Sequence, residues 1–227
     1  MTHYILDNIP FTIDLLALLK EVRLKENSPM AADFTAMAQQ AQAAARPRVL
    51  YKVSLVELDG DQTVLLDGVR FSSRVLNVNL ANTHRVFPFL ATCGVELAAW
   101  AGGFDDLLES FWAGQLMEQA VYASLQFFEA HINILYQPGV MASMNPGSLE
   151  DWPLTEQAPL ISLLGDTRQL IGVHLTDSML MIPAKSVSGV LFPAEESYAN
   201  CQLCPRQACP NRRAPYDEML YARKYQK

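Results

Sequence analysis

The hydrophobic period of the chain changes at Arg46-Pro47, and this change restricts the possible folds more than any other feature. Before it, apolar residues recur at helical spacing over 12–26 and 29–45. Ser28 can cap the second of these helices, and Pro29 suits its first position. After it, side chains over 49–56 alternate between two faces, as in a strand. The first quarter of the chain therefore predicts two helices that lead into a sheet.

Two tight turns extend the strand pattern into an antiparallel meander. Asp59-Gly60 and Asp67-Gly68 are hairpin signals on either side of the apolar run 63–66. A much longer amphipathic helix is predicted from about Phe104 to His131. The other predicted elements are helices over 73–80 and 156–164, a buried strand over 85–92, a loop-rich stretch over 137–153, and short strands near 171–175, 179–182 and 187–192.

Strands and helices do not alternate as βαβ units, so we predict an α+β fold. No linker interrupts the first part of the chain. The sequence therefore predicts one domain over 1–194 and a C-terminal tail over 195–227.

The charge of the chain is uneven. The net charge is −7, yet six of the 17 basic side chains and only two of the 24 acidic ones lie within 201–227. An acidic body argues against nucleic-acid binding, which requires a basic face. The tail is thus a basic segment on an acidic protein, and it could dock an acidic partner.

Neither a secretory signal nor a membrane-spanning stretch is recognisable, which predicts a cytoplasmic protein. In that compartment the four cysteines are expected to be ligands or free thiols. Cys93 ends a predicted buried strand and is expected to be a small core residue.

Cys201, Cys204 and Cys209 form a C-x2-C-x4-C pattern, which is the strongest local sign of chemistry. Two thiolates at this spacing can face one metal ion, and a third nearby can complete three ligands. The pattern suits zinc with a fourth ligand from elsewhere, or an iron–sulfur cluster. A redox dithiol or a tail of free thiols are the alternatives.

No nucleophile elbow, dinucleotide fingerprint or phosphate loop is present, so we assign no catalytic residue. Asn145-Pro146-Gly147 predicts a turn whose glycine allows a close approach to a ligand. A second polar stretch, over 183–189, follows the apolar strand predicted near 179–182. An apolar wall beside a few polar groups suits a cofactor pocket. The predicted binding residues are Asn145, Pro146, Gly147, Ser148, Asp177, Lys185, Ser186, Ser188 and Gly189.

Part of the chain resembles the reactivation domain of cobalamin-dependent methionine synthase. The similarity is strongest in the run Ile171 to Pro183 and in Lys185-Ser186-Val187-Ser188-Gly189, which resemble the family's "LTeS" and "SVSG" segments. Weaker pieces extend it over roughly 49–193, and they include Asn145-Pro146-Gly147, Asp151-Trp152-Pro153-Leu154 and Ala91-Thr92-Cys93-Gly94.

The resemblance implies a curved antiparallel sheet with flanking helices. It also implies a shallow groove that presents S-adenosylmethionine to a corrinoid. In this family, one electron and the methyl group restore methylcobalamin from the inactive cob(II) state. Three positions depart from the family pattern: Ser143 stands where the family has arginine, Ser148 where it has tyrosine, and Tyr122 where it has an acidic residue.

The sequence therefore predicts an accessory protein for corrinoid-dependent methyl transfer. It would be a component of a corrinoid methyltransferase or reductive activation system rather than a complete enzyme, with a corrinoid protein as partner. The alternative is an iron–sulfur or zinc-bearing electron-transfer or interaction module with a degenerate groove.

Overall fold

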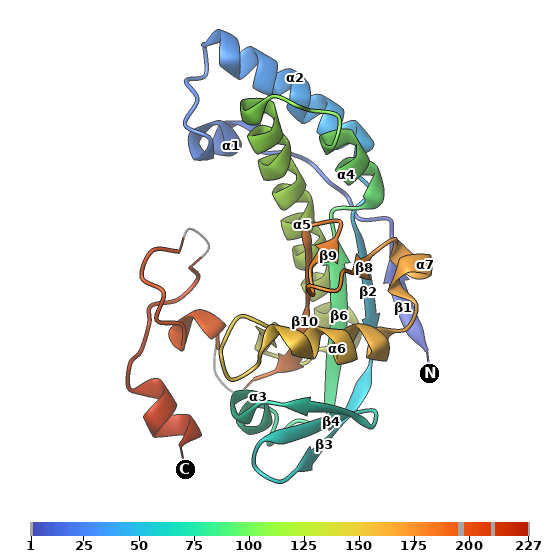
Figure 1. Cartoon of the computed structure of the whole chain (residues 1–227), viewed down its shortest axis with the longest axis vertical. Coiled ribbons are helices and arrows are strands. Elements are labelled where there is room, and N and C mark those ends of the chain that lie inside the picture. Colours follow the sequence, from blue (N-terminus) through green and yellow to red (C-terminus); the bar gives the residue numbers. More distant parts are fainter. Residues whose placement is uncertain (1, 195–197, 210–211, 227) are drawn as a thin grey trace.

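A computed structural model describes residues 2–194, 198–209 and 212–226 (Figure 1). Its helices are α1 (Leu15–Glu21), α2 (Pro29–Ala44), α3 (Arg74–Asn79), α4 (Val95–Ala101), α5 (Leu107–Tyr136), α6 (Gln157–Leu164) and α7 (Thr167–Ile171). Its strands are β1 (His3–Leu6), β2 (Arg48–Lys52), β3 (Ser54–Asp59), β4 (Thr63–Leu66), β5 (Val69–Ser72), β6 (Arg85–Thr92), β7 (Met141–Met144), β8 (His174–Leu175), β9 (Met181–Ile182) and β10 (Ser186–Pro193). Three short helical turns are η1 (Leu154–Glu156), η2 (Asn200–Gln202) and η3 (Tyr221–Tyr225).

The central strand of the main sheet is β6, and every pairing in the sheet is antiparallel. On one side β6 pairs with β10, which in turn pairs with the edge strand β7. On its other side, β2 and β3 follow one another in a single register, with Arg48 opposite Thr92 and Leu55 opposite Arg85. They therefore act as one long strand, which β1 and β4 flank farther out. The predicted meander is confirmed as β3, β4 and β5.

Alternate residues of β6 face opposite layers of the molecule, because side chains in a strand point to the two faces in turn. Phe89 packs against Phe128 of α5, and Phe87 packs against Tyr136 at the end of the same helix. Val86 belongs to the core that includes Leu160 of α6. The sheet is thus covered by α5 on one face and by α6 on the other, which gives the predicted α+β fold with a curved sheet and flanking helices (Figure 1).

The first half of α5 extends beyond the sheet, where it packs with α1, α2 and α4 (Figure 1). Phe34 of α2 and Trp112 of α5 meet edge to face, with their ring centroids 5.4 Å apart. Local signals set where these helices begin. Ser28 accepts a hydrogen bond from the backbone N–H of Ala31, and Asp106 caps the start of α5.

The sequence did not predict β1 or α4, and the helix predicted over 12–26 is shorter, as α1. Two further segments also differ from the prediction. The loop-rich stretch contains β7, whose four residues owe their strand form to pairing with β10. The strand predicted near 171–175 is reduced to β8, since α7 occupies the residues before it. Asp166 caps α7 by accepting from the N–H of Gln169, and Gly172 ends the helix at a φ of 78°.

The C-terminal segment packs against the lower half of the sheet (Figure 1). Tyr225 is buried in the core that includes Phe71 and Val75. Its carbonyl accepts a hydrogen bond from Nε of Arg74 at 3.0 Å, and its hydroxyl donates to Asn79. The predicted boundary between 194 and 195 stays a prediction, because 195–197 lie outside the described residues. None of the helices in the described ranges is both long and apolar enough to cross a membrane.

Candidate functional site

The structure brings together Asn145, Ser188 and Gly189 from the predicted binding residues. Nδ2 of Asn145 donates to the carbonyl of Ser188 at 2.8 Å. A Cβ on Gly189 would lie 2.5 Å from that Nδ2 and 2.6 Å from the carbonyl oxygen of Met144. Glycine is therefore required beside the end of β7, where that strand pairs with β10.

Pro146, Gly147 and Ser148 complete a turn after Asn145. The N–H of Ser148 donates to the carbonyl of Asn145, and the N–H of Gly147 donates to the carbonyl of Trp152. Gly147 has a φ of 82°, and a Cβ there would lie 2.9 Å from Cδ1 of Leu154. The turn thus uses these two amide groups internally, so they hold its shape.

The other predicted binding residues lie farther along the sheet. Lys185 is four residues before Gly189, which is about 13 Å along a strand. Its ammonium is 2.6 Å from Oε2 of Glu118 on α5. Ser186 is buried, with its hydroxyl bonded to Thr92 and to the carbonyl of Pro183. Asp177 is exposed in the turn between β8 and β9. The predicted binding residues therefore fall into two separate groups and do not line a single groove.

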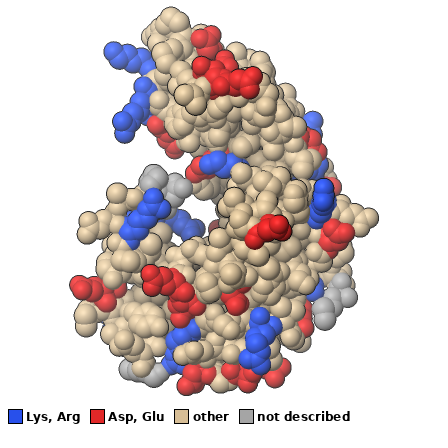
Figure 2. Space-filling view, viewed as in Figure 1, with Lys and Arg blue, Asp and Glu red and all other residues tan. Residues whose placement is uncertain are grey.

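A cleft of about 210 Å³ lies at the edge strand β7, between α5 and the C-terminal segment. Ala199 forms a parallel bridge with Ser143 of β7, which fixes the segment against this edge. Figure 2 shows the surface hollowed between the C-terminal segment and the rest of the molecule. The cleft is lined by Glu129, Met141, Ala142, Ser143, Tyr198, Ala199, Gln202, Arg213 and Ala214.

Two ionisable groups from distant parts of the chain face this cleft. Partial burial raises the pKa of Glu129, and the charge of Arg213 offsets part of that rise. Within the described ranges, no carboxylate lies within 4 Å of the Arg213 guanidinium. Burial and then the hydrogen bond to Glu118 raise the pKa of Tyr122, on the same helix, to about 12. The cleft therefore has a cationic wall and an acidic wall.

The predicted metal ligands are not gathered into a metal site. Across 2–194, 198–209 and 212–226, no three His, Cys, Asp or Glu side chains lie close enough together to hold a metal ion. Cys201, Cys204 and Cys209 are free thiols, each partly exposed. The spacing of the cysteines thus does not by itself bring their thiols together, and the structure gives no support to the expected zinc or iron–sulfur site.

The guanidinium of Arg212 instead organises the cysteine loop. It donates to the carbonyls of Cys201 at 2.9 Å, Cys204 at 3.1 Å and Ala214 at 3.2 Å, and also to that of Arg206. These bonds join four backbone groups through one side chain. The loop is therefore held by a cation that belongs to the chain itself.

Cys201 and Cys93 differ in electrostatic environment. Burial acts to raise the pKa of Cys201, but backbone N–H groups of Arg213 and Ala214 and the nearby arginine charges outweigh it and lower the pKa. Burial raises the pKa of the Cys93 thiol to about 11, as expected for a core residue. Cys201 is thus the more readily ionised of the two.

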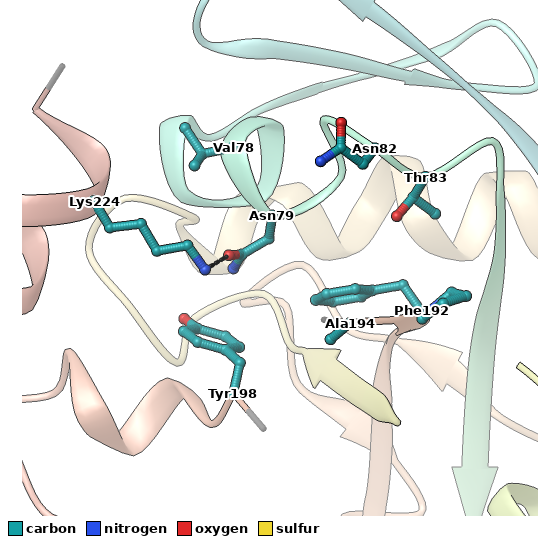
Figure 3. A pocket seen from close by; sticks show the side chains of 9 residues that line it. Val78, Asn79, Asn82, Thr83, Phe192, Ala194, Tyr198 and Lys224 are labelled. Atoms are coloured by element: carbon teal, nitrogen blue, oxygen red, sulfur yellow. Dashed lines mark hydrogen bonds between the residues drawn. The ribbon is translucent and has the colours of Figure 1, made fainter. Parts of the chain in front are cut away.

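A larger cavity of about 500 Å³ lies where α3, the end of β10 and the C-terminal segment meet (Figure 3). Oδ1 of Asn79 accepts from Nζ of Lys224 and from the hydroxyl of Tyr225, each at 3.0 Å. The Lys224 ammonium also lies 5.9 Å from the centre of the Tyr198 ring. Sequence reasoning missed both this cavity and the cleft at β7, because their walls come from segments far apart in the chain.

The antiparallel sheet with a helix on each of its faces defines an α+β protein, and its fold is similar to that of a methionine synthase reactivation domain. A crystal structure of the MetH reactivation domain bound to AdoHcy superimposes with a TM-score of 0.66 at 16% identity, covering 88% of this chain and 81% of that one. A sequence model of the vitamin B12-dependent methionine synthase activation domain matches residues 146–207. The two matches confirm the predicted resemblance. No curated protein matches the chain in sequence.

Proposed function

We propose that this protein takes part in the reactivation of a corrinoid protein, with S-adenosylmethionine as the methyl donor. The observation that carries the proposal is the activation-domain match over 146–207. That range contains the Pro146–Ser148 turn and the run from Lys185 to Gly189. Asn145, directly before the turn, joins the two by donating to the carbonyl of Ser188. The partner is a protein that carries the corrinoid.

The chemistry would reside in the corrinoid and the methyl donor, so this chain's contribution is to bind and orient. One electron and one methyl group are consumed for each cobalt restored, and S-adenosylhomocysteine is released. The edge of β7 suits the donor, because both Arg213 and Glu129 line a cleft there. A guanidinium and a carboxyl group are the complements of the charged end of S-adenosylmethionine.

Calorimetric titration of S-adenosylmethionine into anaerobically purified protein tests the proposal. We expect a dissociation constant below about 10 μM, which corresponds to roughly −7 kcal/mol. The same protein should then increase the rate at which a cob(II) corrinoid protein becomes methylated when an electron donor is supplied. Absence of binding, confirmed by equilibrium dialysis, would contradict the proposal.

A further inference from the structure

The cleft at β7 carries opposite charges that do not pair with each other. Arg213 comes from the C-terminal segment and Glu129 from α5, and both line the same cavity. No ion pair joins them in the described residues, although the charge of Arg213 acts to lower the pKa of Glu129. Two unpaired charges of opposite sign that line one cleft fit a ligand that carries the complementary pair of charges.

The backbone around Arg213 is held in place before any ligand binds. Its N–H donates to Sγ of Cys201 at 3.4 Å. The side chain of its neighbour Arg212 fixes four carbonyls of the same loop, and Ala199 is bridged to Ser143. Because these contacts already hold the backbone on both sides of the cleft, less conformational entropy is lost when a ligand binds.

The size of the cleft limits what it can hold. Sites that enclose whole drug-sized ligands commonly measure about 300–1,000 Å³. At about 210 Å³, this cleft fits only one end of a molecule as large as S-adenosylmethionine. Of its two ends, the amino-acid end carries a carboxylate and an ammonium group, and the adenosine end carries neither.

We propose that Arg213 and Glu129 bind the amino-acid end of S-adenosylmethionine, with the guanidinium on its carboxylate and the glutamate carboxylate on its ammonium group. This inference rests on the proposed function and assigns two residues to it. Ser143, which stands where the family has arginine, lines the same cleft as Arg213. The C-terminal segment thus supplies a guanidinium beside β7, where the strand itself provides only the hydroxyl of Ser143.

A comparison of two ligands and matched variants tests the assignment. Decarboxylated S-adenosylmethionine lacks only the carboxylate, so wild-type protein should bind it at least tenfold more weakly than S-adenosylmethionine. Arg213→Ala should weaken binding of S-adenosylmethionine by a similar factor and lose the discrimination between the two ligands. Glu129→Gln should weaken binding of both ligands, since both carry the ammonium group.

Arg206→Ala is the matched control, because Arg206 is an exposed arginine of the same loop and does not line the cleft. It should bind both ligands as the wild type does, and all variants should share the wild-type melting temperature within about 2 °C.

The outcomes separate the two proposals. If the wild type binds no S-adenosylmethionine, the proposed function fails and this inference fails with it. If the wild type binds but does not distinguish the two ligands, or if Arg213→Ala keeps the distinction, only the inference is overturned. Equal weakening by Arg206→Ala would also overturn it, because the effect would then be a general one of charge.

Discussion

Nζ of Lys185 lies 2.6 Å from Oε2 of Glu118, so an ion pair joins the start of β10 to the middle of α5. The sequence predicts Lys185 as a binding residue, and the structure shows that its ammonium already has a protein partner. Both side chains are partly shielded from water, with 35% and 22% of their surface exposed. The pair therefore links the sheet to the helical part of the molecule.

Lys185→Met should lower the free energy of unfolding by about 1 kcal/mol, the upper range for a partly exposed ion pair. Urea denaturation of Lys185→Met, Glu118→Gln and the double variant would measure the coupling between the two side chains. Effects that simply add would show that the pair contributes nothing to stability.

Gly189→Ala should destabilise the protein by about 1–3 kcal/mol, because the new Cβ would meet Nδ2 of Asn145 and the backbone carbonyl of Met144. Gly114→Ala is the matched control. Gly114 lies within α5, and a Cβ added there would have no neighbouring atom within 4 Å, so the change should stabilise by about 0.5–1 kcal/mol. Thermal unfolding of both variants checks the prediction, and a stable Gly189→Ala protein would contradict it.

Arg212→Ala should loosen the cysteine loop, because four backbone carbonyls lose a donor at once. We expect faster hydrogen exchange over 199–209, with little change in β6. Arg206→Ala should leave exchange in the loop as in the wild type. Unchanged protection in the Arg212 variant would show that other contacts hold the loop.

Cys201 should react with iodoacetamide faster than Cys93 at pH 7. A lowered pKa means that the reactive thiolate of Cys201 forms at a lower pH than in an ordinary thiol, whereas a pKa of about 11 keeps Cys93 protonated. Mass spectrometry of peptides after brief alkylation between pH 6 and 9 measures both rates. A Cys201 rate that rises only above pH 9 would contradict the assignment.

Sequence reasoning succeeded where the signal was local. Ser28 and Pro29 mark the start of α2 through chemistry that involves a few neighbouring residues, and Asp59-Gly60 marks a turn in the same way. The strand over 85–92 is apolar and buried from Val86 to Ala91, since it is covered on both faces. These features depend little on the rest of the fold.

Features that depend on distant partners could not be predicted. The four residues of β7 form a strand only because β10 lies beside them. Arg213 and Glu129 line the same cleft although they are 84 positions apart in the sequence, and no spacing rule connects the C-terminal segment to α5. The three cysteines have a spacing typical of metal ligands, but among the described residues they are not part of any group of three candidate ligands, so their role as ligands stays a prediction.

The way in which Arg212 holds its loop has a consequence for the conditions under which the protein keeps its shape. A guanidinium stays protonated at any physiological pH, takes no part in thiol–disulfide exchange and is not withdrawn by a chelator. The hydrogen bonds that it donates at Cys201 and Cys204 therefore need neither a reduced thiol nor a bound metal ion, because both acceptors are backbone carbonyls.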